Sequence, residues 1–318
     1  MTGLWLRRAV LLAASASSVL LAACGSSTIE SALTPSRFIG FGDGFSDVGQ
    51  TAGGTRHTVN DGSVSLWAEQ IASRYGLSLT AAKSGGQSYA QLNARVLNAT
   101  DAAGGSAPSV KAQIDAFLAT GTFGANDVVL MNGGIADVIA EGQAAITGAQ
   151  SGAQALLNVQ QAGRDLGAQA RRLVQAGAKY VVVSGTYNLG ASRWAAETGQ
   201  RSLLGSLASG FNEALLVSMV DLGANVLYVD AAYYINLVTA SPTVYLGGSG
   251  TASAVVCTST DAGAGIGTGA GQINSAQCTS ATVAGNPGLF VFADRVYLTP
   301  NTNRLFGNYA YDRLRARW

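Results

Sequence analysis

Side chains that could act as a base or a nucleophile are few in this chain of 318 residues, which contains a single histidine, His57. One imidazole excludes sites built from several histidines, and we expect neither a bound metal nor a cofactor. Ser46 and His57 could supply a nucleophile and a base, and Asp294 and Tyr297, three residues apart, are the other candidates. Tyrosine, with an ordinary pKa of about 10, is a poor base at neutral pH.

Apolar runs alternate with helical patterns from Arg37 onward, which is typical of an α/β fold with a parallel sheet covered on both faces. Such folds bind ligands at the carboxyl ends of their strands, where Gly44 and Ser46 would lie. The segment Thr239–Gly288 is expected to be loop-like. The expected strands are Arg37–Gly42, Leu77–Ala81, Asp127–Met131, Lys179–Ser184 and Asn225–Asp230. The expected helices are Val64–Tyr75, one opened by Pro108, Ala153–Ala176, Ser206–Leu222 and Asn301–Arg317.

Five segments, in order, resemble the conserved blocks of the GDSL (SGNH) esterase and lipase family. The matching segments are Phe41–Gly49 (F-G-D-S-L-S-D-x-G in the family), Asn60–Glu69 (N-G-x-x-W-x-E), Tyr89–Val96 (Y-A-x-G-G-A-R-V), Gly133–Asp137 (G-G-x-N-D) and Phe292–Pro300 (F-x-D-x-x-H-P-T). The resemblance covers residues 37–318 and implies a three-layer α/β/α, flavodoxin-like domain. It also implies that the blocks meet in one site for ester hydrolysis.

The family's catalytic triad is mostly replaced at the matching positions. Gly44 stands where the family has its nucleophilic serine, and Tyr297 stands where it has the activating histidine, so only Asp294 is retained. Glycine has no oxygen to attack an acyl carbon, and loss of the nucleophile in a serine protease costs on the order of 10⁶ in turnover. We expect Tyr297 to fill much of the cleft, with its hydroxyl directed to Asp294 or free to bind a ligand.

The oxyanion-binding positions are also altered. By resemblance they are Gly44, whose backbone N–H could still polarise an anion, Asn93 in place of a glycine, and Ala136 in place of an asparagine donor. Loss of one such donor costs about 10²–10³ in turnover. The pair Gly85–Gly86 offers a second register for the glycine block, so the assignment of Asn93 stays open at this point.

Two functions of different classes follow. The first is a catalytically degenerate protein of the cell envelope that binds an acyl, glycan or protein ligand in the former active-site cleft. The second is an active carboxylic-ester hydrolase with rewired residues such as Ser46 and His57. Against the second, a serine at this position more often caps or packs the following helix, and an isolated loop histidine is usually solvated.

The N-terminus is typical of an export signal, because Arg7 and Arg8 precede the apolar run Ala9–Ala22. The run ends in Leu-Ala-Ala-Cys, which resembles a bacterial lipobox with Cys24 as the lipidated residue. We therefore predict a signal peptide at 1–23, a flexible tether at 24–36 and a lipid anchor in the membrane. The absence of an aspartate after Cys24 favours the outer membrane. The alternative is an ordinary signal with an incidental cysteine.

The other two cysteines, Cys257 and Cys278, form an even pair in a chain predicted to be exported, which favours a disulfide. It would close a Gly/Ser/Thr-rich loop near 248–288, whose position relative to the cleft stays open. A redox pair is disfavoured because the C-x-x-C spacing is absent. The net charge of +1 gives no basis for nucleic-acid binding.

Overall fold

The computed structural model describes residues 31–51, 53–64 and 66–318. The predicted signal peptide and Cys24 lie outside the described residues. One compact unit runs from Leu33 to Trp318. Leu33 is buried in the core, and Ser36 donates hydrogen bonds to Asn126 and Asp127, so the folded unit begins before the first strand. No helix in the described part of the chain combines the length and the apolar character needed to cross a membrane.

A parallel sheet of four strands in the order β1-β2-β3-β4 forms the centre of the fold. Its strands are β1 (Arg37–Phe41), β2 (Asp127–Asn132), β3 (Tyr180–Ser184) and β4 (Val226–Tyr228). Each lies within a residue or two of a predicted strand, except that β4 is shorter. Both faces of β2 are buried, which explains its unbroken apolar run. The carboxyl ends of the four strands lie at one edge of the sheet and place the turn after β1 beside the turn after β2.

The predicted strand Leu77–Ala81 is wrong. The chain there folds back through Gly85, which has a left-handed φ of +83°, so that Ser88 bridges both Ala81 and Gly40. Gly86 is packed so closely on the backbone of Thr80 that a side chain would not fit. The edge of β1 is therefore hydrogen-bonded by the segment around Ser88.

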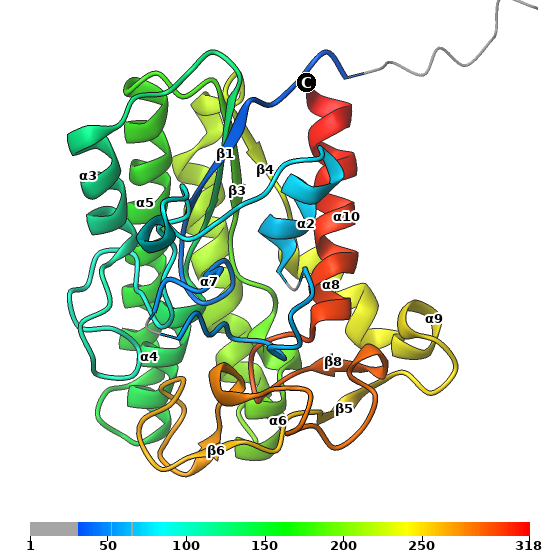
Figure 1. The fold of residues 1–318 in the computed structure, drawn as a ribbon. Coiled ribbons are helices and arrows are strands. Elements are labelled where there is room, and N and C mark those ends of the chain that lie inside the picture. Colours follow the sequence, from blue (N-terminus) through cyan, green and yellow to red (C-terminus); the bar gives the residue numbers. More distant parts are fainter. Residues whose placement is uncertain (1–30, 52, 65) are drawn as a thin grey trace, which may run out of the picture. The chain divides into compact units, whose positions relative to one another are not determined.

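Helices flank the sheet, with α3 and α5 on one side and α2 and α10 on the other (Figure 1). Serine or threonine side chains cap α3, α5 and α10, as local sequence chemistry favours. The helix α4, directly after β2, was not predicted. The helices are α2 (Trp67–Arg74), α3 (Val110–Thr120), α4 (Ile135–Ile146), α5 (Gly152–Gln175), α6 (Arg193–Thr198), α7 (Arg201–Ser218), α8 (Ala231–Ala240), α9 (Pro242–Leu246) and α10 (Pro300–Arg317). Short 3₁₀ helices are η2 (Ala82–Ser84), η3 (Leu189–Ala191), η4 (Val220–Leu222), η5 (Ser275–Gln277) and η6 (Pro287–Leu289).

The segment expected to be loop-like, Thr239–Gly288, contains short regular elements. Besides α9 it holds β5 (Thr251–Val255), which pairs with β8 (Phe290–Phe292), and the hairpin of β6 (Thr260–Asp261) and β7 (Gln272–Ile273). A disulfide joins Cys257 to Cys278 within it, with the two Cα atoms 5.7 Å apart. The segment is thus a cross-linked cap made of turns and short strands.

Candidate functional site

The turn after β1 is fixed by the buried carboxylate of Asp43. Its Oδ1 accepts hydrogen bonds from the backbone N–H of Phe45 at 2.9 Å and from Asn132 Nδ2 at 2.6 Å, and its Oδ2 accepts from Ile135 N at 3.1 Å. Burial raises the pKa of Asp43. Asp43 thereby caps α4 and brings Ala136, in the first turn of that helix, to the same site as Gly44.

A second buried carboxylate, Asp47, connects this turn to the segment that carries Asn93. Asp47 accepts hydrogen bonds from the N–H groups of Gly49 and Gln50 and, at 2.8 Å, from Leu92 N. Burial raises its pKa to about 6. The next residue, Asn93, has a φ of +62° and is the only non-glycine residue with positive φ in the described chain. That conformation favours glycine, which supports Asn93, rather than Gly85–Gly86, as the residue at the site.

His57 is a central residue of this site, and the expectation of a solvated loop histidine is wrong. The side chain is 2% exposed and stacks on the ring of Tyr297, with ring centroids 4.3 Å apart and planes inclined by 14°. His57 Nε2 lies 3.2 Å from Asn93 Oδ1, an atom that only accepts, so Nε2 carries the proton and Nδ1 is a free acceptor. Burial lowers the pKa of His57 to about 4, which keeps the ring neutral at pH 7.

Tyr297 is packed against Gly44 and His57, but its hydroxyl makes no hydrogen bond to Asp294. The side chain is fully buried, and no hydrogen-bond partner for its hydroxyl is found among the described residues. Burial and the nearby carboxylates raise the pKa of Tyr297, so it is a neutral phenol. His57 Nδ1 is equally without a partner in the described chain. The stack thus contains one unused donor and one unused acceptor.

Gly44 lies against this stack with no room for a side chain. A methyl group built on its Cα would collide with Cδ2 of His57 and would come within 3.0 Å of the Tyr297 hydroxyl oxygen and 3.1 Å of its Cζ. Gly44 is buried, and its φ is not positive, so the constraint comes from neighbouring atoms rather than from its backbone. His57 and Tyr297 therefore occupy the volume that a serine side chain would need.

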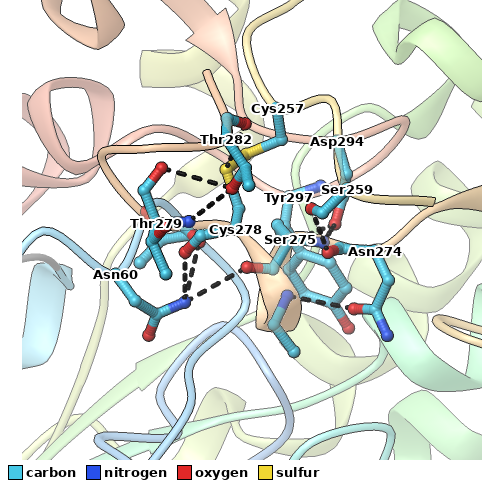
Figure 2. The surroundings of a disulfide bond; sticks show 12 residues. Asn60, Cys257, Ser259, Asn274, Ser275, Cys278, Thr279, Thr282, Asp294 and Tyr297 are labelled. Atoms are coloured by element: carbon cyan, nitrogen blue, oxygen red, sulfur yellow. Dashed lines mark hydrogen bonds between the residues drawn. A yellow bond between two sulfur atoms is a disulfide. The ribbon is translucent and has the colours of Figure 1, made fainter. Parts of the chain in front are cut away.

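Asp294 is bound by the disulfide-closed cap instead of by an imidazole. Its Oδ1 accepts from the N–H groups of Val296 at 2.8 Å and Tyr297 at 2.7 Å, and its Oδ2 accepts from the hydroxyl and, at 3.2 Å, from the N–H of Ser275. Figure 2 shows Ser275 beside Asp294. Burial raises the pKa of Asp294. No sequence signal singled out Ser275 within its Gly/Ser-rich surroundings.

The cap also holds the segment that carries His57. Asn60 Nδ2 donates to the carbonyl oxygens of Ser275 at 3.2 Å and Cys278 at 3.0 Å, as Figure 2 shows. Thr58 Oγ1 donates to Leu298 O at 2.9 Å. The loop whose position the sequence left open therefore contacts the site, and its Ser275 is hydrogen-bonded both to Asp294 and to Asn60 in the segment of His57.

Ser46 is not placed to act as a nucleophile. Its Oγ accepts a hydrogen bond from Trp67 Nε1 at 3.0 Å, and the side chain is buried against α2. No hydrogen bond in the described part of the chain joins Ser46 to His57. Its position agrees with a role in packing the following helix.

An ion pair that the sequence did not reveal connects α4 to the segment of Asn93. Arg95 Nε lies 3.2 Å from Asp137 Oδ1, and Asp137 Oδ2 accepts from Val96 N at 3.0 Å. Burial raises the pKa of Asp137 to about 6. Asp137 thus joins the start of α4 to the segment of Asn93 through one ion pair and one hydrogen bond from a backbone N–H.

Comparison with known proteins gives no assignment: no protein-family model matches the chain, and no curated protein is significantly similar to it. Among the described residues, no group of three or more His, Cys, Asp or Glu side chains is placed to hold a metal ion. What the arrangement offers chemically is a buried, neutral imidazole and phenol beside a glycine, and no hydroxyl or thiol of a described residue is hydrogen-bonded to the imidazole.

Proposed function

We propose that this chain is a catalytically inactive protein of GDSL/SGNH-like descent. In this proposal it is exported and anchored to the outer membrane through lipidated Cys24, and its domain has the three-layer, flavodoxin-like arrangement. The observation that carries the loss of catalysis is the packing of His57 and Tyr297 on Gly44, which excludes a serine side chain. Helices on both sides of the parallel sheet support the fold assignment.

The role proposed for the former active site is to bind an acyl, glycan or protein ligand. Two buried polar atoms support this role, because His57 Nδ1 and the Tyr297 hydroxyl have no hydrogen-bond partner among the described residues. A ligand that displaces either ring would find Nδ1 as an acceptor and the hydroxyl as a donor. His57 is the single histidine of the chain, so its ring signals in NMR are unambiguous in an untagged protein. A ligand of the cleft should shift these signals, whereas a ligand bound elsewhere should leave them unchanged.

One observation favours the alternative of an active carboxylic-ester hydrolase: an imidazole does lie at the family's nucleophile position, although it comes from His57. In the structure, however, Ser46 Oγ accepts a hydrogen bond from Trp67, so a working pair of Ser46 and His57 would need a rearranged turn after β1. The alternative therefore requires that both Ser46 and His57 be essential for hydrolysis.

The deciding experiment measures hydrolysis of short-chain p-nitrophenyl esters, and labelling by a fluorophosphonate, on residues 25–318. We expect no rate above the uncatalysed reaction and no label, with an unrelated serine esterase as the positive control. Hydrolysis that Ser46→Ala or His57→Ala abolishes, and that the exposed-site control Ser84→Ala leaves intact, would establish the esterase instead. Mass spectrometry of the membrane fraction tests the anchor, because an unmodified N-terminus upstream of Cys24 would rule it out.

A further inference from the structure

A cavity of about 560 Å³ lies away from the buried stack, between the start of α6, the end of α8 and β5. In Figure 1, α6 and β5 lie in the lower part of the view and α8 lies above them. The lining consists of small and polar residues and two arginines. It comprises Ala191, Arg193, Arg201, Asn236, Thr239, Ala240, Pro242, Gly250, Thr251, Ala252 and Ser253. A second cavity of about 600 Å³ shares Ala191 and Arg201 with the first, so these two residues lie between the cavities.

The positive charge of the cavity is largely unneutralised. No carboxylate is among the described residues that line it. Glu197, the acid paired with Arg193, lies 3.5 Å from that guanidinium but 2.7 Å from Arg295, so it serves two arginines. Arg201 is exposed and makes one long hydrogen bond, at 3.4 Å, to the carbonyl of Gly190. The chain as a whole carries a net charge of only +1, so this concentration of charge is local.

Arg193 also carries a polar atom that lacks a partner. Its side chain is 22% exposed, yet its Nε is buried and has no hydrogen-bond partner among the described residues. A buried donor without an acceptor is destabilising, and an oxyanion that reached this nitrogen would satisfy it. Guanidinium groups bind planar and tetrahedral oxyanions through paired hydrogen bonds.

The rest of the lining suits an oxygen-rich ligand. Asn236 and Ser253 are exposed at the cavity and carry amide and hydroxyl donors, and Thr251 and Ser253 already bond to each other at 2.9 Å. Thr239 donates its hydroxyl hydrogen to a carbonyl of its own helix, so its hydroxyl oxygen can still accept from a ligand. None of the described residues that line the cavity is aromatic, so they offer no stacking on an apolar ligand.

We propose that this cavity binds a phosphate-type oxyanion, with Arg193 and Arg201 as the charged contacts and the hydroxyl and amide groups around them as neutral donors. The phosphate could belong to a small soluble ester or to an anionic lipid headgroup. The site is independent of the former active site and does not depend on the proposed loss of catalysis.

The test titrates residues 25–318 with glycerol phosphate by calorimetry, at constant ionic strength with sodium chloride as the reference. We expect saturable binding that weakens about tenfold or more in Arg201→Gln and again in Arg193→Gln, because each removes a charge-assisted contact. The matched control is Arg164→Gln, an exposed arginine on α5 that contacts Gln161, and it should bind as the wild type does. Melting temperatures of all variants identify any that fail to fold, and the exposed Arg201 keeps the test available if Arg193→Gln is unstable.

A second arm separates the two sources of phosphate. Flotation with vesicles of phosphatidylcholine, with and without phosphatidylglycerol, measures binding to the headgroup on the same variants, using protein that lacks the lipid anchor. Binding of the soluble ester identifies a free phosphate compound, and arginine-dependent binding to anionic vesicles alone identifies a lipid headgroup. No binding in either arm, or binding that Arg164→Gln weakens as much as Arg201→Gln does, would overturn the proposal.

Discussion

Adding a single methyl group at Gly44 should destabilise the protein through His57. The added carbon would collide with Cδ2 of His57, which would have to withdraw by about 1 Å to reach an ordinary contact distance. His57 is held by Asn93 and by its stack on Tyr297, so the withdrawal breaks existing contacts. Overpacking of this kind costs about 1–3 kcal/mol, which outweighs the gain of about 0.4–1 kcal/mol from a stiffer unfolded chain.

Urea unfolding of the oxidised protein at pH 7 measures this cost for Gly44→Ala. The matched control is Gly223→Ala, because Gly223 has a helical φ of −57° and no neighbour within 4 Å of the added carbon. The control should be neutral or slightly stabilising. Equal midpoints for the two variants would contradict the packing described for the site.

A double-mutant cycle shows whether His57 is the obstacle. In a His57→Ala background the ring of Tyr297 can move into the vacated space, so Gly44→Ala should lose most of its cost. The coupling energy between the two substitutions should then be about 1–3 kcal/mol, as expected for residues in contact. Equal costs of Gly44→Ala with and without His57 would exclude His57 as the obstacle.

Three further results follow from the site. As the pH drops from 6.5 to 4, the free energy of unfolding of the wild type should fall by about 3 kcal/mol relative to that of His57→Gln, because the imidazole of His57 takes up a proton mainly in the unfolded state. Parallel curves of unfolding free energy against pH for the two proteins would exclude this. Reduction of the disulfide between Cys257 and Cys278, which lie 21 residues apart, should lower the free energy of unfolding by about 3 kcal/mol, measured by thermal melting. A Cys257→Ser, Cys278→Ser double variant as stable as the oxidised protein would contradict it. Asp294→Asn should lower the free energy of unfolding in urea by about 1–3 kcal/mol, because an amide has one accepting oxygen where the carboxylate has two. Ser275→Ala should lower it by less, and the reverse order would be inconsistent with the contacts described.

The pH prediction compares two proteins because other groups titrate in the same range. Burial raises the pKa of Asp47 and Asp137 to about 6, and a raised carboxyl pKa stabilises the folded state as the pH falls. This contribution opposes that of His57 in the wild type. It is common to the wild type and to His57→Gln, so it cancels in their difference.

The central strands were predictable because their sequence signal is local. Residues 128–130 and 181–183 are continuous β-branched and leucine runs, which is typical of strands buried on both faces. Helix α4 was missed because its first N–H groups are capped by Asp43, 92 residues upstream of Ile135, rather than by a neighbouring side chain. A window of adjacent residues contains no trace of such a cap.

The candidate site was predictable only in part for the same reason. The block resemblance named Gly44, Asn93 and Tyr297, and the structure brings all three to His57. It did not indicate that His57 would be buried there, because a lone histidine in a polar loop has no pattern that specifies a distant aromatic partner. The contact of Ser275 with Asp294 depends on the fold of the cross-linked cap and was equally invisible.

The stack of His57 on Tyr297 also has a consequence for how the chain folds. The neighbouring hydrogen bond from Thr58 to Leu298 spans 240 positions, so these contacts join the two ends of the folded unit. Such long-range closure is slow and is rewarded only after the intervening elements have formed. While the chain is being made, the turn of Gly44 is not covered by the ring of Tyr297 until that last segment is available. The site around Gly44 is therefore completed late in folding, and a chain that ends before Phe292 would lack the contacts of Tyr297 with His57 and of Leu298 with Thr58.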